Sequence, residues 1–125
     1  MVDLDVSRFD VSGYAAGLRT RERARRRAEA ERRGRMQRAL PAAVEELVQQ
    51  FGVKKVVLFG SLARGDAGLE SDVDLLVDAL PPERWFEAMA RLSAVLDADV
   101  DLVSSGSTRP EVLERALAEG QVLHG

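Results

Sequence analysis

Hydrophobic positions in the last two-thirds of the chain switch repeatedly between helical and strand-like spacing. The first pattern, within residues 40–51, repeats apolar side chains mostly every three or four positions and therefore predicts one buried face of a helix. Its members are Leu40, Val44, Leu47, Val48 and Phe51. Pro41 lies where the first turn of such a helix would start, a position that tolerates proline, and Gly52 is placed to end it.

Three short apolar segments then predict strands. Residues 55–59 form a continuous apolar run rich in valine, as expected for a buried strand. Residues 71–78 and 99–103 alternate acidic and apolar positions, which predicts strands with one face in the core. Between the last two, apolar side chains recur at helical spacing through residue 96, at Trp85, Met89, Leu92 and Leu96.

A last helix is predicted after residue 108, where the sequence Thr-Arg-Pro-Glu has the form of a capping box. Gly120 is placed to end this helix, and residues 121–123 predict a short edge strand. The alternation of helices and strands indicates an α/β fold for residues 39–125.

The first 38 residues form a separate N-terminal extension in this prediction. Residues 1–18 follow no clean period, and we expect them to lie over the body or a partner. Residues 19–38 are rich in helix formers but have no wide apolar stripe, so they predict a solvated or partner-bound basic helical arm. Glutamate precedes arginine by four residues in three favourable pairs, Glu22–Arg26, Glu29–Arg33 and Glu31–Arg35.

Charge divides the chain in the same way. Residues 19–38 hold ten arginines against three glutamates, a sum of +7, whereas residues 39–125 hold seven basic and fifteen acidic residues, a sum of −8. A basic arm on an acidic body is typical of an interaction segment. The body alone would repel nucleic acid over most of its surface.

Composition excludes several kinds of site. The chain has no cysteine and one histidine, His124, which rules out disulfides, thiolate chemistry and a Cys/His zinc site. No apolar run approaches the ~20 residues of a membrane span, so we expect no membrane partner. The N-terminus is acidic and lacks the order of a secretory signal, which favours a cytoplasmic protein.

Acidic residues on the predicted strands point to metal chemistry. Asp72 and Asp74 are two positions apart and therefore project from one face, where their carboxylates repel each other unless a cation such as Mg²⁺ binds. If the next strand is a neighbour, Asp101 joins them, and three carboxylates can hold the two Mg²⁺ ions used in phosphoryl transfer. Asp97 and Asp99 alternate onto the face of Asp101, so the third ligand stays open between Asp99 and Asp101.

The strand over residues 55–59 runs directly into Gly60 and Ser61. A glycine there lets backbone N–H groups approach a phosphate, and the Ser61 hydroxyl can donate to a phosphate oxygen. Arg64, in the same loop, can neutralise phosphate charge. A Gly-Ser pair followed after ten residues by Asp-x-Asp arises by chance in about 0.4% of chains of this composition.

These motifs carry a resemblance to a known family. Residues 58–66 read LFGSLARGD and residues 71–77 read SDVDLLV, which closely resembles the minimal nucleotidyltransferases of the DNA polymerase β-like superfamily. The resemblance covers roughly residues 41–123. It implies a small α/β (α+β) fold, with a mixed β-sheet flanked by helices.

The resemblance also implies roles for individual residues. Asp72 and Asp74 would bind both metals, and Asp101 would bind the catalytic metal and help to activate the acceptor hydroxyl. Gly60 and Ser61 would hold the triphosphate of ATP.

Members of this group commonly act as antitoxins beside a helical HEPN-type ribonuclease toxin, and transfer AMP to a tyrosine of that toxin. The resemblance therefore implies a Mg²⁺-dependent protein adenylyltransferase with a HEPN-type partner. Two alternatives are a non-catalytic module that neutralises its partner by occlusion and an RNA-directed transferase or adaptor that uses the arm from Arg19 to Arg38. A small-molecule acceptor fits less well, because no second domain is present to form a cleft.

Overall fold

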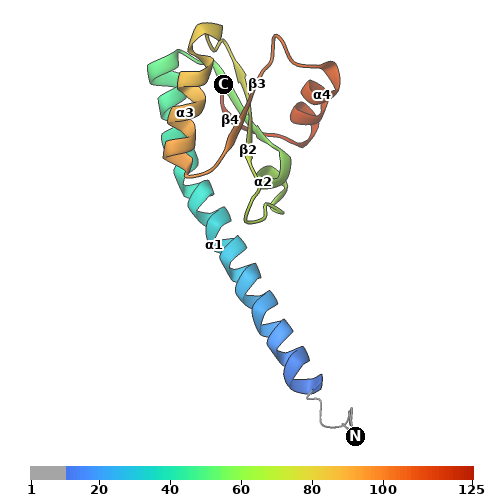
Figure 1. Ribbon diagram of the computed structural model, residues 1–125. Helices are drawn as coiled ribbons and strands as arrows, with labels where there is room; N and C mark the ends of the chain where they lie inside the picture. Colours follow the sequence, from blue (N-terminus) through green and yellow to red (C-terminus); the bar gives the residue numbers. More distant parts are fainter. Residues whose placement is uncertain (1–10) are drawn as a thin grey trace, which may run out of the picture.

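The computed structural model describes residues 11–125, a four-stranded sheet with helices on both faces and one long helix that projects from the body (Figure 1). The helices are α1 (Val11–Phe51), α2 (Gly60–Arg64), α3 (Trp85–Leu96) and α4 (Pro110–Glu119), with a 3-10 turn, η2, at Pro82–Arg84. The strands are β1 (Lys55–Phe59), β2 (Val73–Asp78), β3 (Val100–Ser104) and β4 (Gln121–His124). None of the helices in this part of the chain is long and apolar enough to cross a membrane.

The sheet is mixed, as the resemblance implied. Its strand order is β3-β2-β1-β4. β1 pairs antiparallel with both β2 and β4, whereas β2 and β3 are parallel and are joined through α3. The predicted short strand at the C-terminal end is confirmed as β4, at one edge of the sheet.

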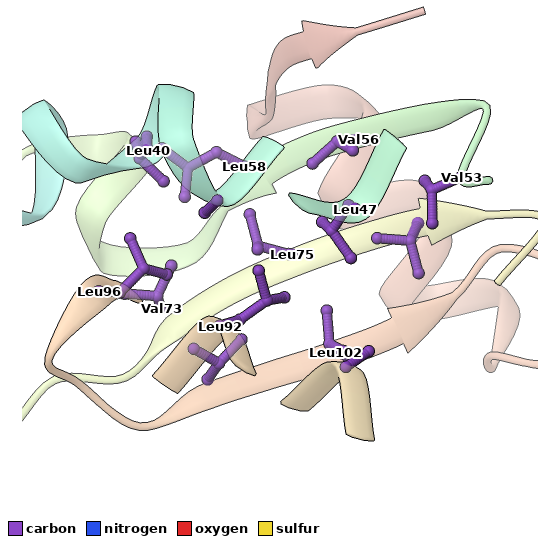
Figure 2. Close-up of a cluster of buried hydrophobic side chains, with 14 of the residues drawn as sticks. Leu40, Leu47, Val53, Val56, Leu58, Val73, Leu75, Leu92, Leu96 and Leu102 are labelled. Atoms are coloured by element: carbon purple, nitrogen blue, oxygen red, sulfur yellow. The ribbon is translucent and has the colours of Figure 1, made fainter. Parts of the chain in front are cut away.

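The strands alternate their side chains between two apolar layers. The larger layer lies between the sheet and the pair α1 and α3, and Figure 2 shows its tightly packed side chains. Among them are Leu40, Leu47, Val56, Leu58, Val73, Leu75, Leu92 and Leu102. The smaller layer lies under α4 and contains Val57, Phe59, Leu76 and Ala116. Asp74 and Asp101 alternate with residues of the larger layer and therefore lie on the α4 side.

The prediction of a separate helix beginning at Pro41 is wrong, because α1 is one helix of 41 residues that passes through this proline. Pro41 supplies no N–H to the carbonyl of Gln37, but both residues are exposed, so water can satisfy that oxygen. Met36 and Leu40 before the proline and Ala43 and Leu47 after it are buried in the core, which fixes the helix on both sides of Pro41.

The expectation of an irregular N-terminal segment is wrong for residues 11–18, which belong to α1. Residues 1–10 lie outside the described part of the chain. The predicted pair Glu22–Arg26 is confirmed at 2.8 Å. Glu29 instead pairs with Arg25 at 3.2 Å.

Two further local predictions are corrected. Thr108 does not cap α4: the N-cap residue is Arg109, which makes no side-chain cap bond, and Pro110 occupies the first turn, where a missing N–H costs little. The second and third strands also start later than predicted, so Asp72 and Asp99 directly precede β2 and β3. The ends predicted at Gly52 and Gly120 are confirmed.

Candidate functional site

Gly60 lies directly against the side chain of Asp74. Gly60 follows the last residue of β1, Phe59, whose register partner on β2 is Asp74. Gly60 has a φ of +73°, and a Cβ built on it would overlap the Oδ2 atom of Asp74. Glycine is therefore required here both for the backbone conformation and for the space that the carboxylate occupies.

Asp101 stands beside Asp74 on the neighbouring parallel strand. The two residues are register partners, each the second residue of its strand. Parallel register partners project from the same face, so the two carboxylates share the α4 side of the sheet. The structure thus brings together Gly60, which directly follows β1, with Asp74 on β2 and Asp101 on β3. Asp72, predicted on the same strand face as Asp74, instead precedes β2.

Unlike Asp74 and Asp101, the residues Asp72 and Asp99 lie just before their strands and not on them. Asp72 ends the segment before β2 and lines a neighbouring hollow together with Arg32 and Asp99. The carbonyl oxygen of Asp99 accepts the N–H of Val73 at 2.9 Å, which places Asp99 at the entrance of β3 rather than on it. Of the two residues left open as third ligand, Asp101 is the one that shares a hollow with Asp74.

The electrostatics of Asp74 show that negative charge accumulates here. Burial raises the pKa of the Asp74 carboxyl, and the negative charges of Asp101 and Asp72 raise this pKa further. The nearby Arg64 guanidinium lowers the same pKa, but as the smallest of the four effects. Among the described residues, no arginine or lysine forms an ion pair with Asp74, Asp101 or Asp72.

Arg64 lines the same hollow and connects two helices across it. Its guanidinium lies 3.2 Å from the Glu119 carboxylate at the end of α4 and 3.4 Å from that of Asp66. Both carboxylates raise the pKa of Arg64, which remains a cation. The side chain is 46% exposed, so its charge remains available to a bound anion.

The hollow between the sheet and α4 has a volume of about 590 Å³ and is open to solvent. The predicted residues Gly60, Ser61 and Arg64 line it with Asp74 and Asp101. Sequence reasoning missed the opposite wall, formed by Ser107, Thr108, Arg109, Val112 and Arg115. Their place depends on how α4 packs over the sheet, and the sequence offered no signal for that packing. One wall is therefore acidic and the other carries two arginines, which suits a nucleotide with phosphates.

The resemblance implies that Mg²⁺ binds here, so the carboxylates of the site can be compared with the ligands that Mg²⁺ usually takes. Within the described part of the chain, no group of three His, Cys, Asp or Glu side chains is placed to hold a metal ion by itself. Mg²⁺ commonly takes only one or two carboxylates and completes its shell with water and substrate phosphates. Asp74 and Asp101 fit that pattern, because they are adjacent carboxylates whose charges repel each other.

A family model described as "Polymerase beta, Nucleotidyltransferase" matches residues 43–125, two-thirds of the chain. The chain belongs to this nucleotidyltransferase family. The matched range contains all the residues that line the hollow between the sheet and α4. It confirms the predicted nucleotidyltransferase family, its fold and the enzyme class.

Relatives of this nucleotidyltransferase domain include a protein adenylyltransferase named MntA from Thermococcus cleftensis. The two are 39% identical over 83 residues, which are 64% of this chain and 84% of the relative. A chain from the crystal structure of a toxin–antitoxin pair with AMP-PNP has a TM-score of 0.61 and 28% identity, covering 67% of this chain and 72% of that one.

A third similar protein comes from the structure of a tri-AMPylated Shewanella oneidensis HEPN toxin in complex with an MNT antitoxin. Its TM-score is 0.59 with 26% identity, and the match covers 72% of each chain. The relatives and neighbours of this nucleotidyltransferase domain thus include both adenylyltransferases and toxin–antitoxin complexes.

Proposed function

We propose that this protein transfers AMP from ATP to a tyrosine hydroxyl of a HEPN-type toxin and so acts as its antitoxin. The observation that carries the proposal is the meeting of Gly60, Asp74 and Asp101 at one end of the strands β1, β2 and β3, inside the region matched by the nucleotidyltransferase family. The named relatives, an adenylyltransferase and two toxin–antitoxin complexes, support the choice of acceptor.

In this proposal the hollow between the sheet and α4 holds ATP. Gly60 and Ser61 lie against its triphosphate. The guanidinium group of Arg64 offsets phosphate charge from the same wall, and those of Arg109 and Arg115 do so from the opposite wall. Asp74 and Asp101 would hold Mg²⁺ in this hollow, and Asp72, which lines the neighbouring hollow, would add negative charge nearby. When bound, Mg²⁺ would neutralise charge on the triphosphate and make the acceptor hydroxyl a better nucleophile.

The acceptor enters from the open side of the hollow. Its hydroxyl oxygen forms a bond to the α-phosphorus of ATP, the bond from that phosphorus to the β-phosphate oxygen breaks, and pyrophosphate leaves. Asp101 accepts the hydroxyl proton, since its carboxylate borders the hollow beside Asp74.

Intact-mass spectrometry tests this function. A purified HEPN-type toxin is incubated with the protein, ATP and Mg²⁺, and we expect it to gain one or more AMP units, located on tyrosine by fragmentation. The gain should vanish with Asp74→Asn and when Mg²⁺ is removed by chelation. A tight complex without any mass gain would contradict the proposal and would favour neutralisation by occlusion.

A further inference from the structure

Two arginines of α1 contact the segment between α2 and β2. Arg33 Nη1 donates to the carbonyl oxygen of Ala67 at 2.9 Å. Arg32 Nη1 donates to the carbonyl oxygens of Gly68 and Ser71, both at 3.0 Å. Both arginines are half-buried, unlike the arginines nearer the N-terminus of the arm. We call residues 65–72 the connecting segment; three of its carbonyl oxygens are held by α1.

The connecting segment joins the two halves of the candidate site. It begins where α2 ends, after Gly60 and Ser61, and it finishes at Asp72. Near its beginning, the Asp66 N–H donates to the Ser61 carbonyl at 3.0 Å. Farther along, the Gly68 N–H donates to Ser71 Oγ at 2.8 Å, a contact within the segment itself.

The middle of the connecting segment therefore contacts the rest of the protein through the arginine hydrogen bonds and through the buried side chain of Ala67. Charged donors make stronger hydrogen bonds than neutral ones. Without them, we expect the segment to sample other conformations, and the position of Asp72 relative to Asp74 to broaden. Misplacement of a reacting group by about 1 Å is enough to lower a rate ~100-fold.

We propose that Arg32 and Arg33 are positioning residues for nucleotidyl transfer: they hold the connecting segment and so fix where the chain enters β2 with Asp72 and Asp74. The proposal rests on the function proposed above. Neither arginine lines the hollow with Gly60, Asp74 and Asp101, so they act through the segment and not on the nucleotide. Both also lie outside residues 43–125, the range that the family model matches.

The test compares two double variants of the full chain with equal loss of charge. Arg32→Gln with Arg33→Gln removes the three bonds, whereas Arg23→Gln with Arg27→Gln changes two exposed arginines of the same arm. Hydrogen–deuterium exchange of residues 66–71 is measured for each, along with kcat and KM for ATP in AMP transfer to the toxin.

We expect exchange in residues 66–71 to accelerate about tenfold or more in the Arg32/Arg33 variant only. We expect kcat to fall about tenfold or more while KM for ATP changes less than about threefold, since Gly60 and Ser61 are held by β1. Lysine at both positions should restore part of kcat, because it retains a charged donor. The single variant Arg33→Gln, which keeps both Arg32 bonds, should give an intermediate result if the double variant folds poorly.

Equal exchange in the two double variants would overturn the proposal. Faster exchange with unchanged kcat would also overturn it, because the segment would then be held for a reason other than catalysis. A wild-type protein that transfers no AMP would count against the proposed function instead. In that case the exchange measurement alone decides whether the two arginines position the segment.

Discussion

Gly60 leaves little room for a larger residue, because the Asp74 carboxylate occupies the space of a Cβ. We expect Gly60→Ala to lower AMP transfer about 100-fold, since the new methyl group must displace Asp74. The matched control is Gly52→Ala: Gly52 has a φ of +71°, close to the +73° of Gly60, but has open space around it. Equal losses of activity in the two variants, measured per folded molecule, would show that backbone strain and not the contact matters.

Asp74 also links the site to stability. Because burial and neighbouring carboxylates raise its folded-state pKa above the usual 3.8, the ionised Asp74 destabilises the fold once the pH has risen through that pKa. This penalty is absent below the unfolded-state pKa. We therefore expect Asp74→Asn to abolish transfer and yet to raise the free energy of unfolding at pH 7.

Urea unfolding at several pH values checks this prediction. The advantage of Asp74→Asn over wild type should shrink as the pH falls toward the unfolded-state pKa. Glu114→Gln, at an exposed position of α4, is the control and should show no such advantage. A variant that is less stable than wild type at pH 7 would contradict the argument.

At the scale of elements, the apolar pattern of the sequence was enough to predict all four strands, and alternation predicted the buried faces of β2 and β3. Val73, Leu75 and Val77 alternate with Asp74, and that alternation alone placed the carboxylate opposite the core. What periodicity could not reveal was the continuity of α1. Pro41 is a local signal for a helix start, but the burial of Met36 on its N-terminal side is tertiary and overrides it.

Met36 therefore offers a test of the long helix. It is 1% exposed and belongs to the main core, although it precedes Pro41 in the segment predicted as a solvated arm. We expect Met36→Ala to lower the free energy of unfolding by about 2–3 kcal/mol, as for other buried methionines. Gln37→Ala, at the exposed neighbouring position, should stay within about 0.5 kcal/mol of wild type. Similar values for both would mean that this turn of α1 does not pack as described.

At the scale of the whole molecule, the boundary predicted between residues 38 and 39 can be tested by truncation. Residues 28–125 keep Arg32, Arg33 and Met36, whereas residues 39–125 lose all three. We expect the longer fragment to match the full chain to within about 1 kcal/mol in urea unfolding. The shorter one should lose about 3 kcal/mol or more. Equal stability of the two fragments would support the boundary at 38/39.

In the whole molecule, several arginines of the arm are already engaged in contacts within the protein. The sequence count of ten arginines between residues 19 and 38 suggested a surface for RNA or for a protein partner. In the structure, Arg25 and Arg26 pair with glutamates of the same helix, and Arg32 and Arg33 are bound to the connecting segment. The contacts of Arg32 and Arg33 could not be predicted from the sequence, because they join residues more than thirty positions apart.

The bonds from Arg32 and Arg33 have a consequence for how this protein tolerates mutation. All three acceptors are main-chain carbonyls, which every amino acid supplies. Side chains at Leu69 and Glu70 can therefore drift over generations without loss of these bonds, while the two arginines cannot. Among related proteins, this contact would therefore appear as variable side chains at positions 69 and 70 together with constant arginines at positions 32 and 33.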